Sequence, residues 1–519
     1  MKIATSPHSS ADGFADVRDA EHPGASDADT PNSAISRSSF MTSLNPDILL
    51  EIFEHGCSTQ ALIVPKETTV PALVLSQVCK SWRSLILAQS SLWSSFAWGK
   101  DIVEGNFEGI ITANERFVDL WDLYLSRSGQ ALLDVSLLLY NHDMSEAREY
   151  LLDSIFSKQN RLKRFRLYCA EWTLPEGKTY RLNSAPRLEY LHFQISNDGD
   201  GFESVSPDKV IVVDMSGFSM LQEVSLSDDV FIQAQEIGME SLRNAYIWPK
   251  EVVGAGSLAP RSLATSTSGL FHFLNIAPRL QSISFLINRP DIVPRSSRSQ
   301  RLLLSHLREG KVFMETGNTE ALDSLLGNLE MPSLESMWLG FHDHFRWEGV
   351  RRRWHLTNGL ALKTLTYLNL SSARFQNPVD EEDLRTILQC TPALEKLEIS
   401  MDEMTSQFVL LLTLQPMENA AGNLCTRLES LSLMAPLAVH RISSKKIVDL
   451  ISSRWRPPQE NHTELPPVDT DSPGLTEVLL QLKLEVGGPL VTDLRFIEPL
   501  SSFIRQGLRL QLFIPIPWQ

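Results

Sequence analysis

The sequence has few cysteines, and their positions argue against the common uses of a cysteine cluster. The chain of 519 residues contains five, which are Cys57, Cys79, Cys169, Cys390 and Cys425. The number is odd, the spacing is irregular and no C-x-x-C motif is present, so neither a disulfide framework nor a metal site is expected. Unpaired cysteines are typical of a reducing compartment, which here predicts the cytoplasm or the nucleus.

Long apolar runs and an excess of positive charge are also missing. No stretch reaches the roughly 20 apolar residues that a membrane-spanning helix needs, so we expect no membrane partner. Residues 1–10 lack the apolar core of a signal peptide. The formal net charge of −16 disfavours a nucleic-acid partner, because affinity for phosphate comes mainly from Lys and Arg.

The remaining composition is that of an ordinary folded protein. Hydrophobic residues make up 43% of the chain and charged residues 21%, which permits a sizeable core. Residues 1–40 differ, because they are rich in Ser, Ala, Asp, Gly and Pro and their apolar residues follow no pattern. We predict that this tail is disordered.

Signals of short helices follow the tail. Asn45 can cap a helix, and Pro46 suits its first turn. Apolar residues then recur four apart, as in Ile48 and Ile52, and so share one face of that helix. We predict an exposed loop over 54–70.

A second helix is predicted to begin at Pro71. Its apolar stripe consists of Val74, Leu75, Val78, Trp82 and Leu85. Leu92 and Trp93 then fall in a short turn or a third helix.

Taken in order, these residues resemble the F-box, in the form common in large fungal families of F-box proteins. The first half reads LNPDILLEIF from Leu44, the second reads VCKSWR from Val78, and the motif ends in the pair Leu92-Trp93. The family usually has Pro where this chain has Asn45, and Asp47 replaces the commoner Glu. The fragment LYLSRSG over 123–129 is similar to a segment that often follows the F-box in these proteins.

The resemblance implies a role without bond chemistry. An F-box binds a Skp-family adaptor, and through it a cullin–RING ubiquitin ligase, so we expect a substrate-recognition subunit of an SCF-type ligase. The alternative is an adaptor-bound scaffold or regulator that acts outside the ligase. The residues that the resemblance assigns to adaptor binding are Leu44, Pro46, Ile48, Leu49, Ile52, Phe53, Val78, Trp82, Leu92 and Trp93. For Phe53 and Trp82, burial inside the module is the competing interpretation.

The chain is thus predicted to consist of the tail over 1–40, an F-box domain over 41–98 and a linker region over 99–158. The linker has helical spacing from Phe117 to Tyr124, a glycine at 129 that suits a left-handed helix cap, and a strand pattern over 132–140.

The rest of the chain, 159–519, repeats the pattern L-x-x-L-x-L ten times. Its first leucines are Leu162, Leu188, Leu221, Leu242, Leu280, Leu334, Leu365, Leu394, Leu428 and Leu475. Several intervals carry a helical segment before the strand, as over 270–276 and 322–329. We therefore predict an α/β fold in which helix–strand units form an irregular leucine-rich-repeat-like solenoid with a parallel sheet.

The spacing of the pattern leaves a second interpretation open. Leucine-rich repeats span about 20–29 residues, whereas here the first leucines lie between 21 residues apart (Leu221 to Leu242) and 54 apart (Leu280 to Leu334). The alternative is a set of unrelated buried strands in one α/β domain. Loops are predicted over 290–317 and 456–473, where the composition is polar.

In such a unit, positions one, four and six point into the core, and positions three, five and seven face the concave side. Several aromatic residues fall on that side, where exposed aromatic clusters often mark binding surfaces. We predict that an unknown protein substrate binds there, through Tyr190, Tyr246, Trp248, Trp338 and Tyr367. The competing interpretation is that helices, insertions or a shifted register bury these side chains.

Motifs of catalysis are weak. The match to G-x-G-x-x-A over 254–259 runs directly into Pro260, and His342-Asp343-His344 has no further ligand at a metal-binding spacing. We therefore expect no catalytic residue, no metal and no cofactor. The alternative is a conventional α/β catalytic domain, which would need a polar pocket at the strand ends.

Overall fold

The computed structural model describes residues 44–63, 68–99, 115–139, 145–170, 178–196, 210–227, 230–233, 239–248, 266–287, 291–292, 301–314, 319–341, 362–372, 381–400, 406–415, 422–435, 442–455, 475–482, 484–485 and 498–512. The predicted tail over 1–40 and the predicted loop over 456–473 lie outside them. The chain divides into two compact units, Met1–Glu51 and Ile52–Gln519. Within the described ranges, no helix is both long enough and apolar enough to cross a membrane.

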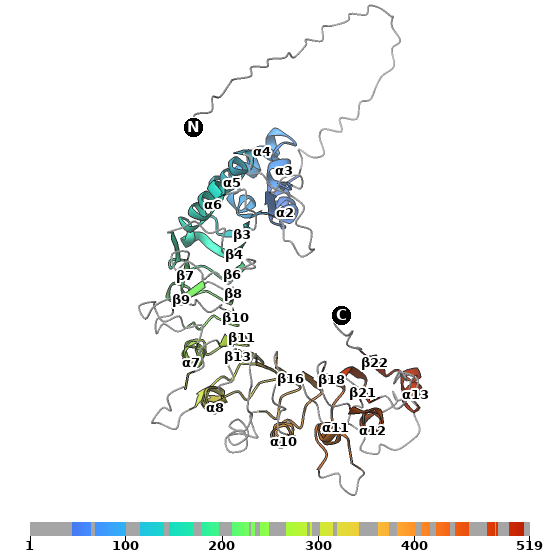
Figure 1. Ribbon diagram of the computed structural model, residues 1–519. Helices are drawn as coiled ribbons and strands as arrows, with labels where there is room; N and C mark the ends of the chain where they lie inside the picture. The colour runs from blue at the N-terminus through green and yellow to red at the C-terminus, as the bar shows by residue number, and fades with distance from the viewer. Residues whose placement is uncertain are drawn as a thin grey trace, which may run out of the picture. The chain divides into compact units, whose positions relative to one another are not determined.

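The larger unit is a mixed α/β structure built on one parallel sheet of 15 strands, whose spatial order follows the chain (Figure 1). Its strands are β1 (Ala61–Ile63), β2 (Ser95–Trp98), β3 (Leu133–Leu139), β4 (Leu162–Ala170), β6 (Tyr190–Ser196), β8 (Glu223–Ser227), β10 (Asn244–Trp248), β11 (Ser282–Ile287), β13 (Glu309–Met314), β15 (Ser336–Phe341), β16 (Tyr367–Ser372), β17 (Lys396–Ser400), β18 (Ser430–Ala435), β20 (Glu477–Leu482) and β22 (Arg509–Leu512).

Helices and shorter strands fill the connections, and the helices from α5 onward follow one face of the sheet (Figure 1). The helices are α2 (Pro46–Gly56), α3 (Pro71–Ser76), α4 (Lys80–Ala88), α5 (Glu115–Arg127), α6 (Ser145–Phe156), α7 (Thr267–Ile276), α8 (Thr319–Gly327), α10 (Glu381–Gln389), α11 (Ser406–Leu412), α12 (Ser444–Arg454) and α13 (Leu500–Arg505). The shorter strands pair as β5 (Thr179–Leu182) with β7 (Val210–Asp214) and β9 (Val230–Gln233), β12 (Leu302–Leu303) with β14 (Leu329–Glu330), and β19 (Ile442–Ser443) with β21 (Leu484–Glu485).

Alternation of side chains explains why the motif predicts these strands. All ten motif segments form strands of the large sheet, and their fourth positions are in register, as Leu397, Leu431 and Val478 illustrate. These three side chains are buried. The next residue along a strand is less buried, as Glu398 after Leu397 illustrates. Because successive residues of a strand point to opposite faces, one face packs under the helices. We call the other the open face.

One prediction in this region is wrong. The segment 290–317 was expected to be a loop, but it contributes β13, which pairs with β11 and β15 in the large sheet. Here Gly310 takes the core position that a leucine or another apolar residue takes in the neighbouring strands, so a search for leucines misses the strand. A Cβ added at Gly310 would lie 3.8 Å from Leu334 Cδ1, which is an ordinary van der Waals distance.

The predicted loop over 54–70 is wrong in part. The first helix, α2, runs on to Gly56, and β1 follows at Ala61–Ile63. Ala61 and Ile63 are buried, and β1 pairs with β2 as the first strand of the sheet. The sheet therefore passes without a break through the predicted F-box region, the predicted linker and the predicted repeats.

The helix expected from Pro71 is also divided. It ends at Ser76, and a second helix begins at Lys80 with Cys79 as its cap. The Cys79 Sγ accepts a hydrogen bond of 3.4 Å from the Trp82 amide, which satisfies one of the unpaired donors at the start of α4. The helix predicted from Phe117 to Tyr124 and the strand predicted over 132–140 are confirmed by α5 and β3, and Gly129 has the left-handed φ expected of a helix cap, 52°.

Candidate functional site

The residues predicted to bind an adaptor differ sharply in exposure. Pro46, Ile48, Ile52 and Val78 are exposed, and Leu44 and Trp82 are half-buried. The other four are buried, namely Leu49, Phe53, Leu92 and Trp93. Only the exposed and half-buried residues offer surface to a partner in this conformation.

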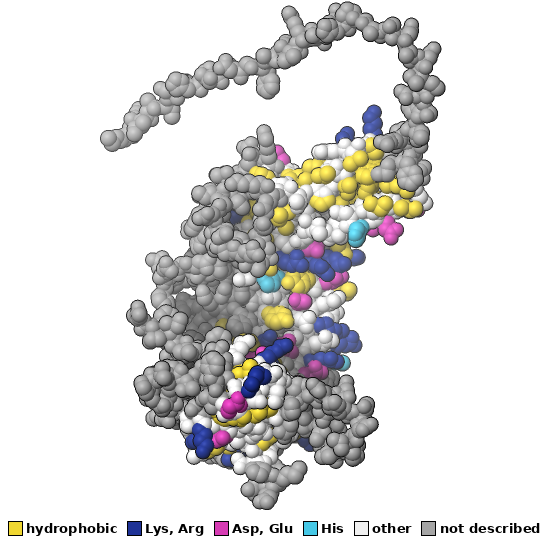
Figure 2. Space-filling view, turned by 90° about the vertical axis from the view of Figure 1, so that its right-hand side faces the viewer, with side chains coloured by type: hydrophobic (Ala, Val, Ile, Leu, Met, Phe, Trp, Pro, Cys, Tyr) yellow, Lys and Arg dark blue, Asp and Glu magenta, His cyan; other side chains and the backbone are white. Residues whose placement is uncertain are grey.

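Exposed apolar side chains concentrate on the helices α2, α3 and α4 and in the turn between α3 and α4. Of the ten large hydrophobic side chains that are exposed in the described part of the chain, half lie between residues 46 and 88. They are Ile48 (48%), Ile52 (51%), Val74 (58%), Val78 (58%) and Leu87 (36%). The last four belong to the larger unit, and we call these four the apolar helix patch. Figure 2 shows hydrophobic side chains gathered at the level of these helices. Val74 and Leu87 were not among the predicted residues.

Helix spacing accounts for this exposure. Ile48 and Ile52 lie one turn apart on α2, which Asn45 caps by accepting a 3.0 Å hydrogen bond from the Asp47 amide. Phe53, one position after Ile52, is fully buried. The two sides of α2 thus have different roles, since one packs inside the protein and the other faces solvent.

The pair at the end of the motif belongs to an internal core. Trp93 is only 1% exposed, and its indole nitrogen donates a 2.9 Å hydrogen bond to the Ile86 carbonyl oxygen. Its ring contacts that of Tyr124 on α5, with centroids 5.1 Å apart. Phe96 and Trp121 make a similar contact at 4.8 Å. These residues join the segment after α4 to α5 and the sheet, so Trp93 supports the fold here.

The predicted substrate residues lie on strands whose open-face positions are in register. Tyr190, Tyr246, Trp338 and Tyr367 are all half-buried, and each directly precedes a buried core residue of its strand. The fifth, Trp248, ends β10, but its side chain lies outside the described residues.

A cation lies beside three of these aromatic rings, and none of the three cations was among the predicted site residues. The Arg166 guanidinium carbon lies 5.1 Å from the Tyr190 ring centroid. The Lys396 ammonium lies 4.8 Å from Tyr367, and that of Lys311 lies 5.8 Å from Trp338. Such contacts stabilise by about 0.5–1 kcal/mol at exposed sites. Cation and ring come from neighbouring strands, so strand register is the signal that would have predicted the pairs.

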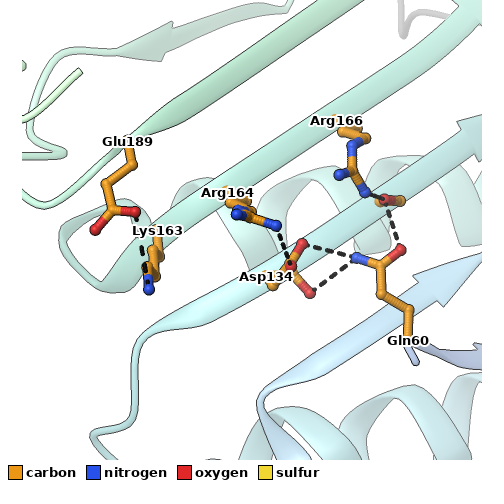
Figure 3. Close-up of polar contacts among 7 residues, drawn as sticks. Gln60, Asp134, Lys163, Arg164, Arg166 and Glu189 are labelled. Carbon is orange, nitrogen blue, oxygen red and sulfur yellow. Dashed lines mark hydrogen bonds and ion pairs between the residues drawn. The ribbon is translucent and has the colours of Figure 1, made fainter. Parts of the chain in front are cut away.

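A polar network ties the start of the sheet together (Figure 3). The Gln60 side-chain amide donates a 2.8 Å hydrogen bond to Asp134 Oδ1, and Ser136 donates one of 3.1 Å to Gln60 Oε1. Arg164 approaches Asp134 at 3.9 Å, and Arg166 donates to Ser136 at 3.4 Å. Burial nevertheless dominates at Asp134 and raises the pKa of its carboxyl above the ordinary 3.8, although both arginines act to lower it.

The weaker motifs of the sequence cannot be placed. The glycine motif over 254–259 and the histidines over 342–344 lie outside the described residues. Within the described part of the chain, no group of three or more His, Cys, Asp or Glu side chains is arranged to hold a metal ion. No protein-family model matches the sequence, and no curated protein matches it.

Proposed function

We propose that this chain is the substrate-recognition subunit of an SCF-type ubiquitin ligase. In this proposal an F-box over 41–98 binds a Skp-family adaptor, and a leucine-rich-repeat-like region binds a protein substrate. The chain itself makes and breaks no bond. It raises the effective concentration of the substrate near the ubiquitin-conjugating enzyme.

The observation that carries the proposal is the apolar helix patch. Its four large apolar side chains remain exposed on α2, α3 and α4 and, at Val78, in the turn between α3 and α4, all within the segment whose sequence resembles the F-box. Exposed apolar clusters of this kind mark protein interfaces, where a few central aliphatic or aromatic residues supply most of the binding energy. The adaptor-binding residues in this account are, in the larger unit, those of the patch and the half-buried Trp82. In the smaller unit they are Leu44, Pro46 and Ile48. Phe53 and Trp93 support the patch from inside.

The order of the strands supports the second half of the proposal. Strands that pair with their neighbours in chain order, most of them after a helix or a short strand, are typical of stacked repeats. Such repeats leave one face of the sheet as an extended binding surface. The half-buried aromatic residues Tyr190, Tyr246, Trp338 and Tyr367 lie on that face.

Co-purification with a Skp-family adaptor tests the first step. The variant Ile52→Asp/Val78→Asp places charge in the patch, where both side chains are more than half exposed, so its fold should survive. The matched control is Leu303→Asp/Leu410→Asp, which changes two exposed apolar residues elsewhere (55% and 41%). Capture by the wild type and the control, with loss in the patch variant, is expected. Failure of the folded wild type to capture the adaptor would refute the proposal.

Addition of the cullin separates the ligase from the alternative. A substrate-recognition subunit should recover the cullin together with the adaptor, in equal amounts for the wild type and the control. An adaptor-bound scaffold or regulator outside the ligase would recover the adaptor alone.

A further inference from the structure

The open face carries an aromatic pair that only the structure reveals. Phe313 on β13 and Trp338 on β15 meet edge to face, with ring centroids 4.8 Å apart. Both are half-buried. Leu286, which is paired in register with Phe313, is also half-buried and extends this apolar surface onto β11.

Gly340 explains why the Phe313 ring can lie close to the sheet. It occupies the open-face position of β15 that is in register with Phe313. A Cβ at Gly340 would lie 2.4 Å from Phe313 Cδ1, a separation that side chains do not tolerate. The Phe313 ring therefore covers the backbone at Gly340, in the space that a side chain at that position would occupy. We call Leu286, Phe313, Trp338 and Gly340 the aromatic shelf.

Charged side chains around the shelf pair with one another. Lys311, beside Trp338, forms a 2.8 Å ion pair with Glu309. Glu309 also accepts a 3.0 Å hydrogen bond from Ser282, and these contacts lower the pKa of its carboxyl. On the far side, Lys396 and Glu398 are 2.8 Å apart. Among the described residues of this part of the face, the charges of these ion pairs cancel, and the aromatic rings are its distinguishing feature.

The aromatic surface near the other end of the sheet has a different character. There Tyr190 and His192 lie beside Arg166, with Arg164 on the same strand. Among the described residues, the charges beside the shelf are balanced, whereas two arginines lie beside the aromatic surface at Tyr190. Contact with an apolar side chain suits the shelf, whereas a charged segment would gain little there and would lose hydration.

We propose that the aromatic shelf binds an extended, uncharged segment of a partner protein, with one aromatic or long aliphatic side chain seated on Phe313 and Trp338. The inference rests on the proposed function, because it gives the chemical class of the substrate segment. The shelf spans β11 to β15, which is two strand spacings of about 4.8 Å, or about 10 Å in all. An extended segment of about three residues covers this distance at about 3.3 Å per residue.

Selection from random twelve-residue peptides displayed on phage, with the full chain as bait, tests this. The selected peptides should share an aromatic or long aliphatic residue among uncharged neighbours. One of them, made synthetically, should bind with little dependence on salt, because screening weakens only charge-based attraction. Trp338→Ala should raise its dissociation constant by about 30-fold or more, as expected for a central aromatic anchor.

Two glycine variants provide a matched comparison. Gly340→Ala should weaken peptide binding, because its Cβ displaces the Phe313 ring. Gly310→Ala adds the same methyl group on the neighbouring strand, where the nearest atom is 3.8 Å away, and should leave binding unchanged. Thermal unfolding shows that each variant is folded.

Three results would overturn the inference. The first is that no peptide is enriched above a bait-free control, and the second is that acidic or basic peptides are enriched. The third is that folded Trp338→Ala binds the peptide as tightly as the wild type. Adaptor capture by the same proteins keeps the two proposals separate. A wild type that captures the adaptor but selects no peptide refutes the shelf alone. One that binds an uncharged peptide through Trp338 but captures no adaptor refutes the ligase role alone.

Discussion

Phe53 on α2 and Trp82 on α4 meet edge to face, with ring centroids 4.8 Å apart and planes inclined at 65°. Phe53 is fully buried, whereas Trp82 is half-buried. The contact fixes two helices that carry the apolar helix patch. Both residues belong to the motif that resembles the F-box, so part of that motif maintains the fold and another part remains available to a partner.

Truncation of Phe53 should therefore act on stability. Phe53→Ala is expected to lower the free energy of unfolding by about 3–5 kcal/mol, because it leaves a cavity beside Trp82. Val78→Ala, at a position that is 58% exposed, should change it by no more than about 0.5 kcal/mol. Urea denaturation measures both. Equal losses in the two variants would show that the helices do not pack in this way.

A buried arginine near the end of the sheet should be equally critical. Arg454 is 3% exposed and donates hydrogen bonds to the carbonyl oxygens of Leu412, Leu424 and Cys425. Burial lowers its pKa to about 10. Arg454→Lys should reduce the free energy of unfolding by on the order of 3 kcal/mol, because a single ammonium cannot reach all three carbonyls.

Arg427 supplies the control for that substitution. Its side chain is 49% exposed and forms a 2.9 Å ion pair with Glu395. Arg427→Lys should change the free energy of unfolding by less than about 1 kcal/mol, as surface ion pairs do. A similar loss in both variants would mean that the carbonyl contacts of Arg454 contribute little.

Asp134 should make stability depend on pH. Burial raises its pKa in the folded state above 3.8, so the folded protein holds this proton more tightly than the unfolded chain. The wild type should then lose stability relative to Asp134→Asn as the pH rises from about 4 to about 7. Denaturation of both proteins across this range measures the difference. A difference in the free energy of unfolding between the two proteins that stays constant with pH would contradict the raised pKa of Asp134.

Much of the sheet follows from the sequence, because burial on one face imposes a period of two on the strands. The ten motif segments carry that period and form ten of its strands. The strand β13 escapes the pattern because Gly310 replaces a large apolar residue. The short strand β1 escapes it because Ala61 and Ile63 are too few to show a period.

The candidate sites were predicted less completely. Exposed Ile48 and buried Leu49 are both aliphatic members of the same motif, so composition cannot separate them. The aromatic shelf depends on the register between β13 and β15, which brings Phe313 over Gly340. Two residues 27 positions apart in the chain carry no local signal of that contact.

The most direct test of the account is amide hydrogen exchange of the full chain with and without a Skp-family adaptor. The account predicts slower exchange over residues 46–56 and 71–88, and unchanged exchange over β13 to β16. Protection confined to other segments, or none at saturating adaptor, would contradict the claim that the apolar helix patch is where an adaptor binds.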